Sequence, residues 1–92
     1  MLIRSQDKEI LVNMEASIVF HISGVIGKKY PIFVYWKANG YVIGFYSTKT
    51  KAIKVLDMIQ KRYEEYETER IYKEGVFKIE TFQMPEDSEV EA

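Results

Sequence analysis

The chain of 92 residues is long enough for one domain with a single core, and its 47% hydrophobic and 29% charged residues are typical of a globular protein. It contains no cysteine, which excludes a disulfide framework, a thiol nucleophile and a zinc site built on sulfur. The formal net charge is −1 and the apolar runs are far shorter than the roughly 20 residues of a membrane span, so we expect a cytoplasmic protein that does not enter a membrane.

Short strands are expected in the first quarter of the chain, where apolar residues recur with a period of two. The first is Leu2–Ser5. Two more, Ile10–Met14 and Ser17–Ile22, are joined by a predicted turn at residues 15–16. The residues that share one face of these two strands are Ile10, Val12 and Met14, and then Ile18, Phe20 and Ile22.

A loop follows, bracketed by Gly24, Gly27 and Pro31, with Lys28 and Lys29 near its tip. Its glycine spacing is not that of a phosphate-binding loop, which also requires Ser or Thr after the lysine. We therefore expect a plain connection between strands.

A tight hairpin is predicted where Asn39 and Gly40 separate two aromatic-rich runs, Ile32–Lys37 and Tyr41–Tyr46. Asn and Gly supply the positive φ that a two-residue turn requires. Strict alternation on the second arm places Tyr41, Ile43 and Phe45 on one face and Val42, Gly44 and Tyr46 on the other. Both faces of the hairpin are then apolar, unlike a sheet that has one face in water.

A helix is predicted from Thr48 onward, because the apolar period changes to that of an amphipathic helix. Ser47 or Thr48 is suited to cap its first turn. The apolar stripe fades after Tyr66, and Gly75 is a second candidate end, so the pattern leaves the end of the helix open. The stripe consists of Ala52, Val55, Leu56, Ile59, Tyr63 and Tyr66.

A final strand, Val76–Phe82, and an acidic segment complete the chain. Residues 85–92 carry four acidic residues and no basic one, and we expect them to form a disordered tail. Residues 1–84 then form a single α+β domain. We predict a strongly twisted antiparallel sheet of five to six short strands, with a partly open barrel as an option, and one long amphipathic helix packed on it.

One helix covers only one face of a sheet, so the second apolar face of the hairpin needs another cover. The sequence leaves four covers open: closure into a barrel, the first strands of the chain, a second copy, or a foreign protein. Protein contact, with self-association as one form of it, is therefore the favoured function.

Side chains suited to catalysis are sparse. His21 is the one histidine and lies inside a predicted strand, and the carboxylates gather in the helix and the acidic segment. We expect no enzyme activity, no catalytic residue, no metal site and no cofactor.

An anion site is a candidate at the predicted helix start. Lys49 and Lys51 occupy the first turn, where the helix dipole disfavours cations, and Thr48 and Thr50 add hydroxyl groups beside free amides. A phosphate or an acidic partner would fit these four residues. The alternative interpretation is a pair of solvated lysines.

A candidate interaction surface combines the loop lysines with aromatic residues of the hairpin. Such a set also suits stacking of single-stranded bases, which makes a nucleic-acid binder using basic and aromatic residues of the 28–46 region the alternative function. Aromatic residues in strands also pack across the sheet with no ligand at all. The candidate residues are Lys28, Lys29, Tyr30, Phe33, Tyr35 and Tyr46.

Three segments resemble small uncharacterised proteins of Gram-positive bacteria, their phages and integrated mobile elements. They are residues 2–8 (LIRSQDK), residues 46–52 (YSTKTKA) running into residues 55–60 (VLDMIQ), and residues 82–86 (FQMPE). The resemblance implies a cytoplasmic accessory protein of a mobile element, and it implies no activity and no site residue.

Overall fold

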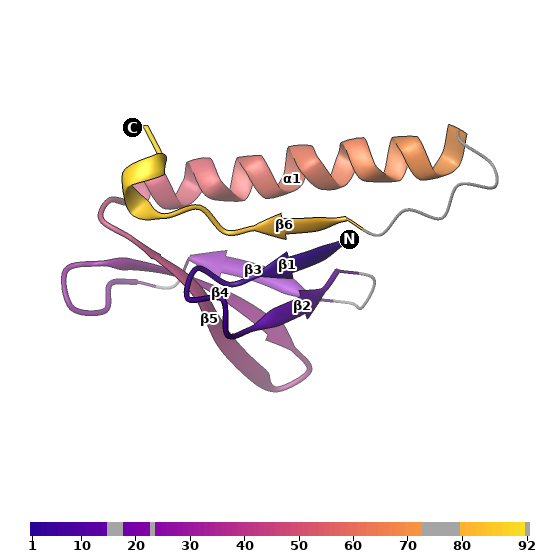
Figure 1. Cartoon of the computed structure of the whole chain (residues 1–92). Helices are drawn as coiled ribbons and strands as arrows, with labels where there is room; N and C mark the ends of the chain where they lie inside the picture. Colours follow the sequence, from indigo (N-terminus) through magenta and orange to yellow (C-terminus); the bar gives the residue numbers. More distant parts are fainter. Residues whose placement is uncertain (15–17, 23, 73–79, 92) are drawn as a thin grey trace.

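The structure, a computed structural model, describes residues 1–14, 18–22, 24–72 and 80–91. Within these residues, six strands form two small sheets, and one long helix packs on them, which confirms the predicted α+β class and number of strands (Figure 1). The elements are β1 (Leu2–Arg4), β2 (Leu11–Asn13), β3 (Val19–Ile22), β4 (Tyr30–Trp36), β5 (Asn39–Tyr46), α1 (Lys49–Tyr72), β6 (Thr81–Gln83) and the short 3-10 helix η1 (Asp87–Glu89).

The strands divide between two sheets of three strands each, which do not close into a barrel. One sheet has the order β3-β4-β5 and is antiparallel throughout. The other has the order β2-β1-β6, in which β1 pairs antiparallel with β2 and parallel with β6. The parallel pair was not expected, and it brings the two ends of the described chain into one sheet.

The alternation predicted for β2 and β3 is confirmed. Val12 and Phe20 are half-buried, whereas Leu11 and Val19, on the opposite faces, are 56% and 61% exposed. The predicted turn at 15–16, residue 75 and positions 76–79 of the predicted last strand lie outside the described residues. Strand β6 occupies the end of that predicted strand.

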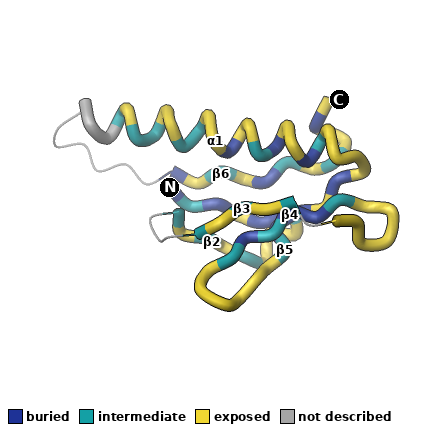
Figure 2. Tube along the Cα trace, turned by 180° about the vertical axis from the view of Figure 1, so that it is seen from behind, coloured by how far each residue is buried: buried dark blue, intermediate teal, exposed yellow. Residues whose placement is uncertain are grey.

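Helix α1 begins after Thr48, whose Oγ1 accepts a hydrogen bond from the backbone N–H of Lys51 at 3.1 Å. This bond is the N-cap that the sequence predicts. Ala52, Val55 and Ile59 lie at or below 3% exposure, so the predicted apolar stripe faces the sheets (Figure 2). The helix continues beyond Tyr66 to Tyr72.

The hairpin turn lies two residues earlier than predicted. Trp36 pairs with Asn39, so Lys37 and Ala38 make the turn, and Lys37 takes the positive φ of 56°. Gly40 instead lies within β5 opposite Tyr35. A Cβ on Gly40 would stand 2.6 Å from Cε1 of Tyr35, so the glycine here makes room for an aromatic ring rather than for a turn.

A β-bulge overturns the strict alternation predicted for the second arm. Ile32 pairs with Gly44 and Phe33 pairs with Val42, which leaves Ile43 as the extra residue of β5. A bulge shifts the register by one residue, so the faces exchange beyond it. The residues buried in this part of β5 are therefore Ile43, Gly44 and Tyr46.

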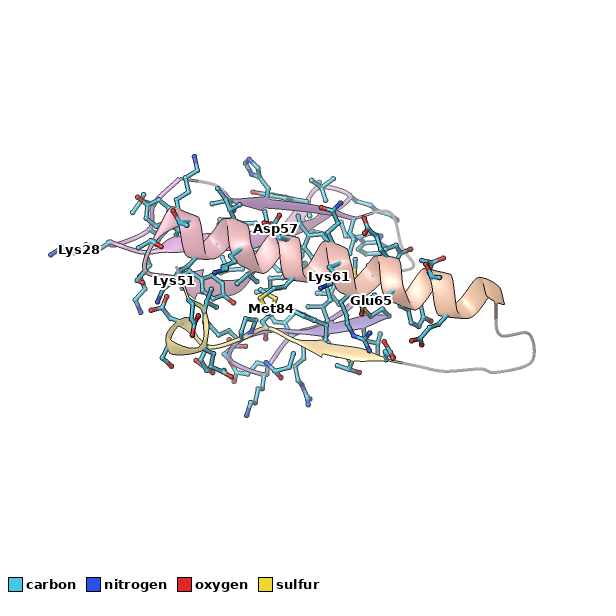
Figure 3. The ribbon with its side chains drawn as sticks, turned by 90° about the horizontal axis from the view of Figure 1, so that it is seen from above. Lys28, Lys51, Asp57, Lys61, Glu65 and Met84 are labelled. Atoms are coloured by element: carbon cyan, nitrogen blue, oxygen red, sulfur yellow. The ribbon has the colours of Figure 1, made fainter. Side chains whose placement is uncertain are left out.

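The core lies between α1 and the inner faces of the two sheets. Figure 3 shows Met84 beneath the helix, on the side of β6. The buried hydrophobic residues are Met1, Ile3, Ile32, Val34, Ile43, Tyr46, Ala52, Val55, Ile59, Met84 and Val90. Among the described residues, no helix is both long enough and apolar enough to cross a membrane.

Residues 85–91 pack against the start of α1, which differs from the tail expected for 85–92. Val90 is only 5% exposed and joins the core. Asp87 accepts a hydrogen bond from the backbone N–H of Ser47 at 2.7 Å, and Lys54 Nζ donates to the carbonyl of Glu91. The acidic composition of this segment predicted disorder, because acidic residues bury little apolar surface. The burial of one apolar side chain and several polar contacts offset the entropy lost when the segment is ordered.

Candidate interaction surface

The face of the β3-β4-β5 sheet that points away from α1 is apolar. We call it the outer face. The pairing of the strands places Val19 beside Tyr35, His21 beside Phe33, and Phe33 beside Val42, all on this side. Ile32 and Val34, at alternate positions of β4, point into the core instead. The outer face therefore consists of Val19, His21, Phe33, Tyr35 and Val42.

Aromatic rings form a packed cluster at the centre of the outer face. Phe33 and Tyr35 stack with their centroids 5.8 Å apart and an interplanar angle of 21°, and His21 lies 6.4 Å from Tyr35. The ring of Tyr35 also lies against Gly40. These contacts leave Phe33 and Tyr35 half-buried rather than fully exposed. The sequence indicated that this second apolar face needs a cover. Part of the apolar surface is covered by contacts among the rings of the face itself.

The loops at the two ends of the outer face are basic. No Asp or Glu occurs between Ser17 and Asp57, and of the six lysines in this stretch Lys28, Lys29 and Lys37 belong to the loops next to β4, whereas the other three lie in α1. Lys37 Nζ lies 4.8 Å from the ring centroid of Trp36 at the hairpin tip. At the other end of the sheet, Lys28 projects away from the body of the protein (Figure 3).

The structure brings together only part of the predicted interaction surface. Phe33 and Tyr35 share the outer face, and Lys28 and Lys29 lie exposed in the loop before β4. Tyr30 is half-buried against the core.

Tyr46 does not belong to the surface, because the bulge at Ile43 turns it inward. Tyr46 is 0% exposed, and its hydroxyl donates to the carbonyl of Pro85 at 2.8 Å. Burial raises the pKa of the Tyr46 phenol, and the nearby carboxylates of the C-terminal segment raise it further.

The predicted anion site is partly occupied by the chain itself. Lys51 Nζ lies 3.0 Å from the carbonyl oxygen of Asp87 and 3.4 Å from its Oδ2, and Thr48 caps the helix. Lys49 and Thr50 are exposed and do not join them. The hydrogen bond from the backbone N–H of Ser47 holds the pKa of the Asp87 carboxyl below its ordinary value, and the side chain of Lys51 lowers this pKa further. The sequence analysis did not predict that Asp87 contacts the start of the helix. The signal was present, because an acidic segment and a basic helix start in the same chain attract each other.

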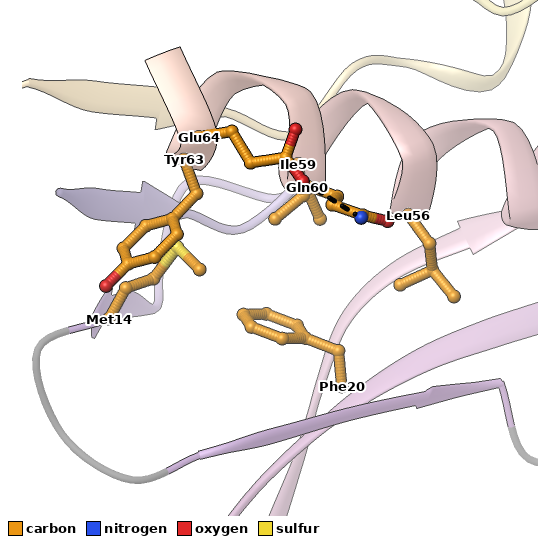
Figure 4. Close-up of a pocket in the computed structure, with 7 residues that line it drawn as sticks. All are labelled: Met14, Phe20, Leu56, Ile59, Gln60, Tyr63 and Glu64. Carbon is orange, nitrogen blue, oxygen red and sulfur yellow. Dashed lines mark hydrogen bonds between the residues drawn. The ribbon is translucent and has the colours of Figure 1, made fainter. Parts of the chain in front are cut away.

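A second feature, which the sequence did not predict, is an apolar groove between α1 and β3 (Figure 4). Its volume is about 380 Å³. Phe20 points into it from β3, and Gln60 donates a hydrogen bond to Glu64 at 3.1 Å on the helix side. The groove is lined by Met14, Phe20, Leu56, Ile59, Gln60, Tyr63 and Glu64.

Within the described part of the chain, no group of three or more His, Cys, Asp or Glu side chains is arranged to hold a metal ion. His21 is exposed on the outer face and contacts the ring of Tyr35. No protein family, no curated protein and no solved structure matches this chain.

Proposed function

We propose that this protein is a non-enzymatic interaction module whose outer face binds an acidic segment of a partner protein. The observation that carries the proposal is the cluster of Phe33, Tyr35 and His21 on the outer face, within a stretch that contains no acidic residue. Contacts with water are unfavourable for large apolar side chains, and clustered aromatic residues on a surface mark binding sites.

The stacked rings suit the centre of an interface. A ring that neighbours already hold in place loses little conformational freedom when a partner binds. Aromatic residues at such positions often account for 2 kcal/mol or more of binding free energy, as an order of magnitude. Phe33 and Tyr35 would therefore contribute most of the affinity, with Val19 and Val42 at their sides.

The lysines specify the chemistry of the partner. Lys28 and Lys29 lie at one end of the sheet and Lys37 at the other, so cations flank the apolar centre. A partner segment with apolar residues between acidic ones complements this arrangement, whereas a basic partner would be repelled. The resemblance to small proteins of phages and mobile elements supports an accessory role in the cytoplasm.

Single-stranded nucleic acid is the second candidate partner, because the same rings and lysines could stack bases and contact phosphates. The positions of the lysines favour a protein. A nucleic-acid backbone needs cations along its path beside the stacked bases, whereas here the lysines lie beyond the two ends of the ring cluster.

The test uses a variant that removes the rings and keeps the strand. In Phe33→Thr/Tyr35→Thr, threonine maintains β-propensity while the apolar cluster is lost. Proteins that bind the wild type in a lysate of the native host are identified by mass spectrometry, purified and measured by calorimetry. We expect an acidic partner whose affinity falls roughly tenfold or more with the double variant.

Tyr41→Thr is the matched control, because Tyr41 is 48% exposed in the same hairpin but lies on the opposite face. It should leave the affinity unchanged. A partner that binds the double variant as tightly as the wild type would overturn the proposal. So would tight, salt-sensitive binding of a labelled oligothymidylate that Lys28→Gln/Lys29→Gln abolishes, which would assign the outer face to nucleic acid.

A further inference from the structure

The two edges of the β3-β4-β5 sheet are treated differently by the chain. At β5, Gln6 acts as a short substitute for a strand. Its backbone N–H donates to the carbonyl of Ile43 at 2.7 Å, and its side-chain Oε1 accepts from the N–H of Phe45 at 2.8 Å. Its Nε2 donates to the carbonyl of Phe45 at 3.2 Å. Gln6 therefore covers the part of the β5 edge from Ile43 to Phe45.

At β3 the edge has no such cover within the described residues. Strand β3 pairs with β4 on one side, and none of its residues takes part in other backbone hydrogen bonds within the described chain. Val19–Ile22 contains no charged residue and no proline. Natural edge strands usually carry lysine, proline or a bulge to prevent pairing with another chain. This edge lacks all three.

The apolar groove lies directly beside this open edge. Phe20, from β3, and Leu56, from α1, form opposite sides of the groove (Figure 4). A strand added to β3 would lie about 4.8 Å away in the plane of the sheet and direct alternate side chains toward the helix. Ile53, three residues before Leu56 on the same side of α1, is 45% exposed and would be covered too.

We propose that the strand that fills this position is β3 of a second copy of the chain. Antiparallel pairing about a two-fold axis at Phe20 keeps Ile18, Phe20 and Ile22 on the helix side of both copies. Each copy then adds its β3 to the sheet of the other copy. The apolar side chains of that strand lie over the groove of the other copy, so both grooves are covered. The paired strands contain no Lys, Arg, Asp or Glu, so no like charges lie opposite each other across the pair.

The dimer would contain a continuous sheet of six strands. Its two outer faces would lie side by side and form one longer surface. The inference itself does not depend on what that surface binds, because it rests on the edge of β3 and the groove.

Sedimentation of the purified protein tests the inference directly. Over roughly 5–500 µM we expect a monomer–dimer equilibrium, together with a melting temperature that rises with concentration. Val19→Lys places a cation on the edge strand at an exposed side chain and should raise the dissociation constant of the dimer roughly tenfold or more. Leu11→Lys, a similarly exposed leucine on the edge strand β2 of the other sheet, should leave the dimer intact.

The outer-face variant Phe33→Thr/Tyr35→Thr should also remain dimeric, which separates a failure of this inference from a failure of the proposed function. A wild-type monomer at every concentration would overturn the inference. A dimer that Val19→Lys does not weaken would overturn it as well. If the monomer instead bound an apolar fluorescent dye, and Leu56→Gln abolished that binding, the groove would belong to an apolar ligand.

Discussion

Tyr35 owes its position to a glycine on the neighbouring strand. Gly40 has no side chain, so the ring of Tyr35 can lie directly on the backbone of β5 while it stacks on Phe33. The pair shows how one residue type serves different physical needs. Glycine is selected in turns for its positive φ, whereas here it is required for close approach.

Gly40→Ala should therefore disturb the outer face. The new Cβ would stand 2.6 Å from Cε1 of Tyr35, so the ring must swing away and give up its contact with β5. We expect a loss of about 1 kcal/mol in the free energy of unfolding, measured by urea denaturation. In a Tyr35→Thr background the same substitution should cost much less, because no ring remains to be displaced. An equal cost in both backgrounds would refute the steric explanation.

The sequence could not distinguish these two roles of Gly40. Asn followed by Gly is a strong hairpin signal, and the turn nevertheless forms at Lys37 and Ala38. Pairing of Trp36 with Asn39 extends both arms and brings Tyr35 over Gly40, so contacts between strands outweigh the local preference of the turn. Likewise, no pattern in the sequence marks the bulge at Ile43, and that bulge decides that Tyr46 is core rather than surface.

At the level of elements, the C-terminal segment acts as a clamp on the start of α1. Asp87 binds the backbone of Ser47 and the side chain of Lys51, and Val90 joins the core. A carboxylate near the first turn of a helix also interacts favourably with the helix dipole. The clamp pairs Lys51 with a carboxylate, which offsets the unfavourable position of this lysine in the first turn of the helix.

Asp87→Asn should weaken the clamp. The variant keeps the shape of the side chain and removes its charge, so we expect a loss on the order of 1 kcal/mol at neutral pH, reduced by solvent exposure. Because folding lowers the pKa of Asp87, its contribution is present above the ordinary value of 3.8 and is lost as the pH falls through the folded value.

Thermal melts of the wild type and Asp87→Asn should therefore differ at pH 7 and converge in acid. Asp57→Asn is the control, since Asp57 is exposed on α1 away from the C-terminal segment, and it should match the wild type. A difference between wild type and Asp87→Asn that persists unchanged in acid would show that the carboxylate charge is not the cause.

Elements with a clear period were predictable, and the contacts between distant segments were not. The stripe from Ala52 to Ile59 repeats with the period of a helix, so its buried face could be read directly. The clamp and the parallel pairing of β1 with β6 depend on segments far apart in the chain, and no local pattern encodes such partners. The same limit applies to the groove, because two separate elements form it.

For the whole molecule, one core joins both sheets and the helix, so we expect a single cooperative unfolding transition. Ile3 is 0% exposed in β1 of one sheet, whereas Trp36, the only tryptophan, lies in the other. Ile3→Ala should cost about 2–5 kcal/mol. In urea, tryptophan fluorescence and the helical signal in circular dichroism should shift to the same lower midpoint. Separate midpoints for the two signals would mean that the sheets are independent units.

The parallel pairing of β1 with β6 also has a consequence for the order in which the protein folds. Strands β3, β4 and β5 and helix α1 are neighbours along the chain, so their contacts form after short loop closures. Ile3 meets Phe82 only after nearly the whole chain has been brought together. We expect the joining of these two strands to be the slowest event of folding, because it closes the longest loop in the chain.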